Sequence, residues 1–343
     1  MAGAEQLLKG QIAVVSHRRD FDGIACAALL LHRYGGRVGA MIFTNPNRDE
    51  FFGSLAKLGG LSNGTVIITD LSASANYADG LPDMLKGLRA RGNAVLWIDH
   101  HPWPDQAVEA ARGHADLLIA GESPKCGAEL VYDNLCDGDE TCRKIAGLAH
   151  ITDFNLKASD RATDEALMRL SDIITFLDFD DDRANAMRRK LVEVVASGAI
   201  TGPVIDGFYA EYKKAESDNI DSIRRSVLSY KIGGHIIGIA FSENLQSNRA
   251  CALIKELTGA DIMVYVTTKD STAHVRSDAG VDSSMLSKAL GGNGHEQASG
   301  FMLAGDFHGF DAAGIAEYSK RVIDAAAAVY RGQRRRDAQG SRA

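Results

Sequence analysis

The sequence predicts an α/β fold, in which a domain built on a parallel sheet is followed by a smaller α/β domain. Two observations lead to this prediction. Short apolar runs rich in β-branched residues alternate with helix-like segments over about the first hundred residues, and similar runs return after residue 230. The length of 343 residues also gives room for two domains of ordinary size, each with its own core.

The elements of the first domain follow a strand, helix, strand order. The apolar run 12–15 predicts a strand, and residues 23–34 predict a helix that ends at Gly35 and Gly36. The next predicted elements are a strand at 66–69, a helix at 81–91 and a strand at 94–98. This order is typical of a parallel sheet with right-handed crossovers.

The rest of the chain predicts a helical middle and a second sheet. Residues 125–225 have a helical pattern, and the acidic run 178–182 predicts the capped start of a helix rather than a metal site. Strands are predicted at 236–241 and 262–266, with a helix at 248–257 between them. We therefore expect a first domain over residues 1–190, a helical linker over 191–228, a second domain over 229–330, and a basic tail over 331–343 that is solvated or touches nucleic acid.

Composition narrows the class of protein. The formal charge of −7 argues against a protein that grips long duplexes, because phosphate neutralisation needs a broad basic surface. No apolar run approaches the ~20 residues that cross a bilayer, and the N-terminus lacks the pattern of a signal peptide. The five cysteines form no CxxC pair, which argues against a disulfide framework and against a cysteine zinc site. We expect a cytoplasmic protein with no membrane partner that acts on short or small phosphorylated molecules.

Ligand-type side chains follow the predicted strands at the point where each strand ends. They are His17, Asp20 and Asp22 after the first strand, Asp70 after the second, and Asp99, His100 and His101 after the third. The carboxyl ends of parallel strands lie at one edge of a sheet, so these groups should form one cluster. Acids and imidazoles this close together need cations, although Asp20 alone could cap the helix that follows it. The cluster predicts metal-dependent phosphoester hydrolysis.

A glycine-rich turn over residues 291–295 is either an ordinary loop or a turn that wraps an anion with its backbone N–H groups. Thr152-Asp153 and Arg276-Ser277 complete a set of motifs. In this order, and with the Asp-His-His triplet at 99–101, the motifs resemble the DHH phosphoesterase family and its DHHA1 domain over roughly residues 12–305. The resemblance implies a parallel-sheet DHH domain, a smaller α/β DHHA1 domain, and an active-site cleft between them.

The resemblance also implies two metal ions per active site, bridged by one aspartate. The ligands would be His17, Asp20 and Asp70 for one ion, and Asp22, Asp70, His100 and Asp153 for the other. Mn²⁺ is the expected metal, because imidazole ligands favour a transition metal, and Mg²⁺ or Co²⁺ are possible substitutes. A hydroxide shared by the two ions would be the nucleophile.

The remaining roles implied by the resemblance concern proton transfer and substrate binding. His101 would donate to the phosphate or assist the leaving oxygen, and Asp99 would orient the histidines. Across the cleft, the substrate would be bound by Arg276, Ser277, Gly292, Asn293, Gly294 and His295. The chain departs from the family pattern in the two-residue spacing between His17 and Asp20, and in the Asn that interrupts the usual run of glycines.

Two other polar side chains have structural interpretations at this stage. Cys126 is a core residue or lines the cleft, and the core is favoured. His32 lies in the first predicted helix and is interpreted as an ordinary helix residue.

The leading hypothesis is a Mn²⁺-dependent phosphodiesterase, an exonuclease of the oligoribonuclease type, which releases nucleoside monophosphates from short single-stranded oligonucleotides. An alternative with the same chemistry is hydrolysis of a cyclic dinucleotide or of phosphoadenosine phosphate. A non-catalytic partner in replication or repair is a different class, and it is disfavoured because every expected metal ligand is present. RNA or DNA preference, cleavage polarity, a possible homodimer and the role of the basic tail stay open.

Overall fold

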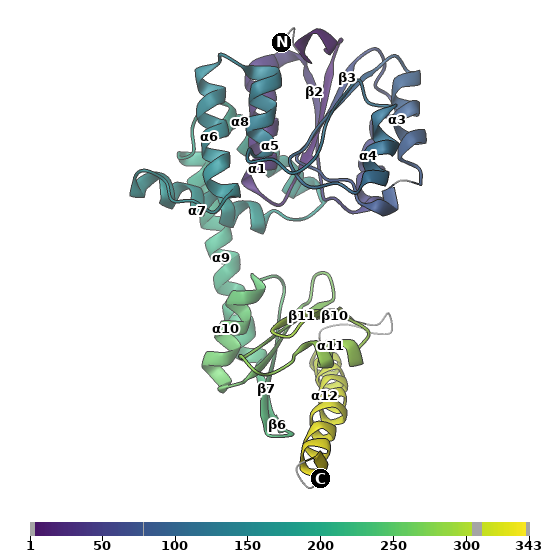
Figure 1. Cartoon of the computed structure of the whole chain (residues 1–343). Helices are drawn as coiled ribbons and strands as arrows, with labels where there is room; N and C mark the ends of the chain where they lie inside the picture. Colours follow the sequence, from purple (N-terminus) through teal and green to yellow (C-terminus); the bar gives the residue numbers. More distant parts are fainter. Residues whose placement is uncertain (1–3, 78, 304–310, 341–343) are drawn as a thin grey trace. The chain divides into compact units, whose positions relative to one another are not determined.

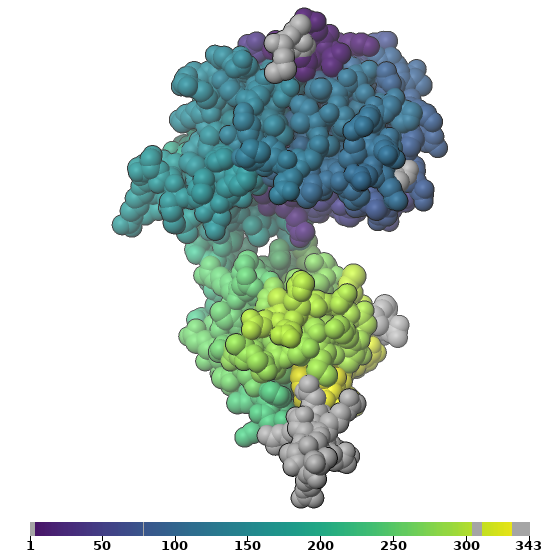
Figure 2. All heavy atoms as spheres, in the orientation of Figure 1, coloured from purple at the N-terminus to yellow at the C-terminus, as the bar shows by residue number. Residues whose placement is uncertain are grey.

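The computed structural model describes residues 4–77, 79–303 and 311–340, with the backbone alone for residues 331–340. The chain divides into two units, Met1–Tyr212 and Lys213–Ala343. In Figure 2 the colours follow the sequence, so the first unit runs from purple to teal and the second from green to yellow. No helix within the described ranges is both long and apolar enough to span a bilayer.

A five-stranded parallel sheet forms the centre of the first unit, with strand order β2-β1-β3-β4-β5. The strands are β1 (Ile12–His17), β2 (Val38–Thr44), β3 (Thr65–Thr69), β4 (Ala94–Ile98) and β5 (Leu117–Ile119). The chain turns to opposite sides after β1 and after β3, so these two central neighbours form the switch point of the sheet. In open α/β sheets, ligands bind beyond the carboxyl ends of the strands at this point.

Helices cover both faces of the first sheet (Figure 1). One face is covered by α1 (Phe21–Tyr34), α5 (Gly127–Val131), α6 (Glu140–Asp153), α7 (Arg161–Phe176) and α8 (Asp182–Ala196), and the other by α2 (Arg48–Ala56), α3 (Leu81–Ala90) and α4 (Asp105–Arg112). Successive strand residues point to opposite faces, so Val14 and Leu96 enter the core with α1, while Val15 and Trp97 enter the core with α3. Burial on both faces explains why the central strands β1, β3 and β4 are mostly apolar rather than alternating.

The second unit contains a six-stranded mixed sheet with the order β10-β11-β9-β8-β7-β6, in which β7 and β8 pair in parallel. Its strands are β6 (Leu228–Ile232), β7 (His235–Ser242), β8 (Ile262–Thr267), β9 (Thr272–Ser277), β10 (Asn293–His295) and β11 (Ala298–Met302). Its helices are α9 (Pro203–Ser226), which begins in the first unit, α10 (Ser247–Thr258), α11 (Ser284–Ala289) and α12 (Ala312–Gly340). The helix α10 packs on one face of this sheet, and α11 and α12 pack on the other.

Short helical turns complete the fold. They are η1 (Ala4–Leu7), η2 (Gly35–Arg37), η3 (Ala75–Tyr77) and the π-helical turn η4 (Tyr132–Cys136).

The predicted fold class, a parallel-sheet domain followed by a second α/β domain, is confirmed, and the three strands predicted in the first domain are β1, β3 and β4. The prediction missed β2 and β5, since these strands lie at the two edges of the sheet and their residues are only partly buried. The acidic run does cap a helix, because Asp181 Oδ1 accepts the Ala184 N–H at the start of α8.

The boundaries of the domains differ in detail from the expected ones. Residues 191–196 of α8 pack in the core of the first unit, so this unit continues past residue 190, and the division at Tyr212 falls inside α9. The basic tail begins inside α12, whose backbone is helical as far as Gly340. The side chains of residues 331–343 lie outside the described part of the chain.

Candidate metal centre

The predicted metal ligands converge at the switch point of the first sheet. His17 is the last residue of β1, Asp70 directly follows β3, and His100 lies two residues after β4. Asp22 enters from the first turn of α1, and Asp153 is the last residue of α6. The structure therefore brings together side chains from five segments of the chain, and the outermost two, His17 and Asp153, are 136 residues apart in the sequence.

The ligand atoms form two overlapping groups that share Asp70. Nδ1 of His17 lies 2.6 Å from Asp20 Oδ2 and 3.5 Å from Asp70 Oδ2. The other oxygen, Asp70 Oδ1, lies 3.4 Å from His100 Nε2. Because each oxygen of Asp70 faces a different histidine, this carboxylate has the placement of a bridging ligand.

The second group is centred on His100. Its Nε2 lies 3.8 Å from Asp22 Oδ2, and its Nδ1 lies 3.8 Å from Asp153 Oδ2. Ligand atoms of Asp22, His100 and Asp153 all lie within 4.8 Å of one another, as do those of His17, Asp20 and Asp70. The first group has the residues of one predicted ligand set, and the second group has those of the other set apart from Asp70, whose Oδ1 faces His100.

Local backbone geometry positions the residues of the first loop. The side chain of Asp20 caps α1 by accepting the Gly23 N–H with Oδ1, while its Oδ2 faces His17. The capping and ligand interpretations of Asp20 are thus compatible, since each uses a different oxygen. Gly23 is required here, because a Cβ at this position would lie 2.2 Å from the carbonyl oxygen of His17.

Asp70 adopts a left-handed backbone conformation, with φ of 53°. Non-glycine residues reach this region at a cost of roughly 1–3 kcal/mol and cluster at functional sites. The backbone N–H of Asp70 donates to the Ile98 carbonyl at 3.0 Å, which fixes the turn against β4. The turn directs the carboxylate between the two histidines rather than along the strand.

Asp22 is held by two backbone amides at the start of α5. Its Oδ2 accepts the Gly127 N–H at 2.7 Å, and its Oδ1 accepts the Ala128 N–H at 2.8 Å. Neither amide was identified from the sequence. Cys126, just before them, is fully buried and belongs to the core, as favoured above.

The electrostatics of the cluster require positive charge. Burial and the charge of Asp70 raise the pKa of Asp22 well above its ordinary value, and burial and the charge of Asp20 do the same for the pKa of Asp70. Burial also raises the pKa of Asp153. Burial opposes ionisation of His17, but the carboxylates of Asp20 and Asp70 outweigh it and raise the pKa of His17 to about 10.

The polar atoms at the centre of the cluster fit divalent cations. Asp70 Oδ2 and His100 Nε2 are buried and make no hydrogen bond. A buried polar atom without a partner costs several kcal/mol, and cations between these atoms would satisfy them and allow the carboxylates to ionise. The donor set of imidazole nitrogens and carboxylate oxygens suits Mn²⁺, Fe²⁺, Co²⁺ or Zn²⁺.

The two catalytic candidates form a hydrogen-bonded chain with a tryptophan. His101 Nδ1 donates to Asp99 Oδ1 at 2.9 Å, and Trp103 Nε1 donates to Asp99 Oδ2 at 2.6 Å. The contact with Asp99 raises the pKa of His101 to about 9. Asp99 orients His101 alone, since His100 faces Asp153 instead. Trp103 was missed in the sequence, where a single aromatic residue after the triplet carries no signal.

A network of charged residues anchors the loop that carries the first ligands. Arg18 Nε donates to Asp178 Oδ1 at 2.8 Å, and Arg19 Nε donates to Asp178 Oδ2 at 2.6 Å. Arg18 also pairs with Glu50 of α2. Burial opposes the charge of Asp178, but the two arginines outweigh it and lower the pKa of this carboxyl. The sequence did not indicate this partner, because Asp178 lies 160 residues from Arg18.

The substrate-binding candidates of the second unit share one end of its sheet. In the register, Arg276 of β9 lies opposite Ala298 of β11, which in turn lies opposite His295 of β10. Arg276 donates to Asn248 Oδ1 at 3.0 Å and to Ser247 Oγ at 3.2 Å, at the N-terminus of α10. His295 is exposed on the edge strand β10. Its register opposite Ala298, which lies opposite Arg276, places His295 on the same face of the sheet as Arg276.

The glycine-rich segment 291–295 is not a turn throughout as predicted, because Asn293–His295 form the strand β10, and its backbone packs closely. A Cβ at Gly292 would lie 2.1 Å from the Gly300 carbonyl oxygen, and Gly294 has φ of 142°. Asn293 lies between them on β10 with its side chain exposed. The hydroxyl of Ser277 donates to the Val281 carbonyl at 2.6 Å, so it stabilises its own loop in this structure.

Comparisons with known proteins give one family match and several similar folds. A family model described as the N-terminal domain of the DHH family matches residues 11–155. Among solved structures, the chain is similar to the DHH domain of a member of a family of ribosomal proteins, with 16% identity, 93% of this chain and 86% of that chain covered, and a TM-score of 0.52.

Two further structures are similar at low identity. The exonuclease RecJ bound to manganese shares 14% identity, with 94% of this chain and 92% of that chain covered and a TM-score of 0.50. The pGpG-specific phosphodiesterase PggH from Vibrio cholerae shares 16% identity, with 92% and 99% covered and a TM-score of 0.47. No curated protein matches the chain.

Proposed function

We propose, on the premise that this chain belongs to the DHH family through its residues 11–155, that the protein is a metal-dependent phosphoesterase that hydrolyses short oligonucleotides to nucleoside monophosphates. The observation that carries the proposal is the pair of ligand groups that share Asp70 at the switch point of the sheet. The buried and unsatisfied Asp70 Oδ2 and His100 Nε2 at their centre support two cations rather than a network of protein hydrogen bonds.

In this proposal, one Mn²⁺ is held by His17, Asp20 and Asp70, and another by Asp22, Asp70, His100 and Asp153. Two such cations supply a nucleophilic water at neutral pH and neutralise phosphoryl oxygens. The Gly127 and Ala128 amides hold the carboxylate of Asp22 in place as a ligand of the second cation. Co²⁺ and Mg²⁺ are the expected substitutes, and Mg²⁺ should be the weaker one because imidazole ligands favour transition metals.

His101 is proposed as the group that meets the phosphate or the leaving oxygen. Its Nδ1 is taken by Asp99, so Nε2 is the atom left for the substrate, and the side chain is 41% exposed. Asp99 is a positioning residue, because it is fully buried and reaches the substrate only through His101.

We assign substrate binding to the second unit, through Arg276 and the glycine-rich segment that contains Gly292, Asn293, Gly294 and His295. Arginine binds phosphate in a bidentate manner, and glycines let the backbone approach it closely. Ser277 belongs to this set only if a ligand displaces its bond to the Val281 carbonyl. A reducing compartment such as the cytoplasm suits the five unpaired and buried thiols.

Product analysis on a substrate panel tests the function. The purified chain with Mn²⁺ is given a labelled RNA dinucleotide, an RNA pentamer, a long single-stranded DNA, cyclic di-AMP and phosphoadenosine phosphate. We expect monophosphate release, fastest from the shortest linear RNA. Activity on the last two compounds alone would replace the proposal with the small-nucleotide alternative, and bound metal without any turnover would favour a non-catalytic partner.

A pair of variants assigns the activity to the site. Asp70→Asn removes the shared charge while keeping the size of the side chain and a residue type that tolerates positive φ. We expect it to lose turnover and one or both metal ions. Asp83→Asn is the matched control, because Asp83 lies in the first turn of α3 with its side chain 88% exposed. Equal losses in both variants would contradict the site assignment.

A further inference from the structure

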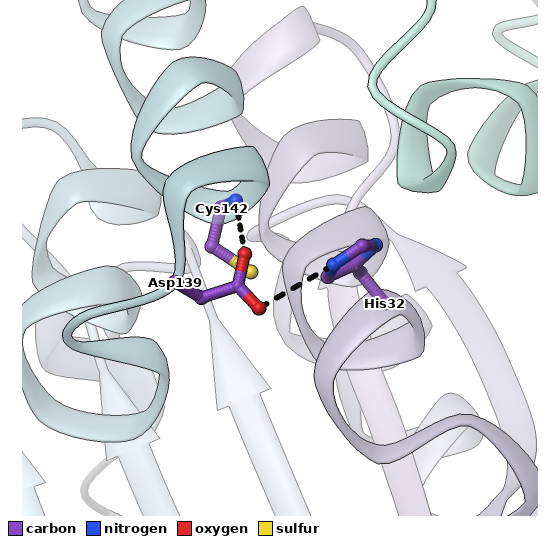
Figure 3. Close-up of side chains that lie close together, drawn as sticks. All are labelled: His32, Asp139 and Cys142. Carbon is purple, nitrogen blue, oxygen red and sulfur yellow. Dashed lines mark hydrogen bonds and ion pairs between the residues drawn. The ribbon is translucent and has the colours of Figure 1, made fainter.

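A second group of metal-ligand side chains lies in the first unit, away from the proposed active site. It consists of His32 near the end of α1, Asp139 before α6, and Cys142 in the first turn of α6 (Figure 3). One donor atom of each residue lies within 4.8 Å of the donor atoms of the other two. Local spacing does not reveal this group, because His32 is more than a hundred residues from the other two and the cysteines form no CxxC pair.

The imidazole of His32 is oriented for coordination. Its Nδ1 donates to the Ala196 carbonyl at the end of α8, at 2.6 Å, which leaves Nε2 as the unprotonated nitrogen of the neutral ring. Metal-binding histidines commonly have their second nitrogen fixed in this way by a backbone carbonyl. Nε2 faces Asp139 Oδ2, as the dashed line in Figure 3 shows.

The distance between these two atoms fits a shared metal ion better than a hydrogen bond. Nε2 of His32 and Oδ2 of Asp139 are 3.4 Å apart, beyond the usual range for a nitrogen–oxygen hydrogen bond. A tetrahedral Zn²⁺ with its nitrogen and oxygen ligands at about 2.0–2.1 Å separates those ligands by about 3.3 Å. The pair is therefore already spaced as one edge of a coordination tetrahedron.

Asp139 has one oxygen committed to the fold and one available. Its Oδ1 accepts the Cys142 N–H at 2.9 Å and so caps α6. This hydrogen bond lowers the pKa of Asp139. The free Oδ2 carries the charge toward His32, and the buried thiol of Cys142 lies on the inner side of both groups.

We propose that His32, Asp139 and Cys142 bind one Zn²⁺ ion. One imidazole nitrogen, one carboxylate oxygen and one thiolate sulfur are all ordinary zinc ligands, and the thiol releases its proton to solvent when it binds. The side chains of His32 and Asp139 are 30% and 23% exposed, which gives the ion an entry path and leaves the fourth position to water. The donor set includes sulfur, so it selects Zn²⁺ over Mg²⁺ or Ca²⁺.

The location of this zinc site gives it a structural role. The helices α1 and α6 pack against each other, and the site joins one end of each. At the other ends of the same helices, Asp22 and Asp153 approach His100. The two sites are roughly 15 Å apart along α1, because His32 lies ten positions after Asp22 and each residue of an α-helix rises about 1.5 Å. The zinc ion fastens the helix pair that carries two of the proposed active-site ligands.

Cobalt spectroscopy of the full chain tests the site by a signal that only a thiolate ligand produces. The protein is freed of metal, kept reduced with a phosphine, and titrated with Co²⁺. We expect a sulfur-to-cobalt charge-transfer band with the intensity of one thiolate-bound ion per chain, and Zn²⁺ should abolish it. The band should saturate by three equivalents, because the proposed active site takes up to two further Co²⁺ ions. The band should be missing in Cys142→Ser and present in Cys251→Ser, a matched control because Cys251 is a buried cysteine of the second unit.

Variants of the two partly exposed ligands keep the test valid if Cys142→Ser fails to fold. For His32→Gln and Asp139→Asn, the Co²⁺ concentration that half-saturates the band should rise by at least roughly tenfold. Asn caps helices as well as Asp does, so the metal-free melting temperature of Asp139→Asn should equal that of the wild type. That variant therefore separates the ligand role of Asp139 from its capping role.

Three results would overturn the proposal. They are the absence of a band in the wild type, an unchanged band in Asp139→Asn and His32→Gln, and a band that survives in Cys142→Ser but is lost in Cys126→Ser. The last result would place the ion near Asp22, where Cys126 is buried. None of these readouts involves hydrolysis, so they are independent of the proposed function.

Discussion

Replacing Gly127 by alanine should damage the proposed active site by way of a single methyl group. Gly127 packs between the two buried aspartates of the cluster. A Cβ at this position would lie 2.9 Å from Asp22 Oδ2, 3.1 Å from Asp70 Cβ and 3.4 Å from Cys26 Sγ. Ordinary contacts begin at about 3.4 Å, and the fully buried Cys26 leaves no space on the third side.

The size of the effect follows from these contacts. The Asp22 carboxylate must retreat by about 0.5 Å, and this movement weakens its bonds from the Gly127 and Ala128 amides. Overpacking of this kind costs about 1–3 kcal/mol of stability. A misplacement of up to 1 Å in an active site lowers the rate by as much as ~100-fold, so we expect a 10- to 100-fold fall in kcat and weaker Mn²⁺ binding.

The assay compares Gly127→Ala with Gly87→Ala in Mn²⁺ titrations of dinucleotide hydrolysis and in urea unfolding. Gly87 lies within α3, and an added Cβ there meets no atom within 4 Å. That control should retain full activity and gain about 0.5–1 kcal/mol, because alanine is the better helix former. If Gly127→Ala kept the wild-type kcat and Mn²⁺ affinity, the claim that a Cβ at position 127 displaces the Asp22 carboxylate would be refuted.

Three further predictions concern other parts of the network. Asp99→Asn should lower kcat by about 100-fold without loss of bound metal, because the amide no longer fixes the tautomer of His101. Kinetics combined with metal analysis measure both effects, and a loss of metal in the variant would contradict the prediction. Asp178→Asn should lower the free energy of unfolding by about 2 kcal/mol at neutral pH, since two arginines lose a charged partner. The pKa of Asp178 is lowered in the folded state, so the stability that its charge contributes is present above pH 3.8, the ordinary pKa of Asp. This stability is lost as the pH falls through the folded-state pKa of Asp178. Denaturant unfolding from pH 3 to pH 7 should therefore show the free energies of unfolding of the wild type and the variant converge in acid. Arg276→Lys should raise KM about tenfold with kcat nearly unchanged, because a lysine cannot bind a phosphate in a bidentate manner, and an unchanged KM would remove Arg276 from the substrate site.

The central part of the fold was predictable because its strands are buried on both faces. The apolar runs 12–15, 66–68 and 94–98 form most of β1, β3 and β4, and a ligand-type residue follows each run within two residues. The edge strand β2 was not predictable, since it is partly exposed and contains Gly39. In the second unit, β9 and β11 alternate buried and partly exposed residues, and so they lack a long apolar run.

The candidate site divides in the same way. Side chains that can act as ligands are visible in a sequence, and the structure brings all six predicted ones together. Contributions from the backbone, such as the amides of Gly127 and Ala128, have no residue-type signature. Contacts over long separations, such as Arg18 with Asp178, depend on how the helices pack and cannot be read from local spacing.

The backbone of Asp70 also limits what evolution or an engineer can place there. The position needs a negative charge that reaches two histidines, and it needs a residue that accepts φ of 53°. Asp and Asn are the side chains that tolerate this region best, so only Asp meets both demands. Glutamate would preserve the charge and still fail, because it adds a methylene to a fully enclosed space and prefers a different backbone conformation. A substitution usually regarded as conservative would thus be among the most damaging at this position.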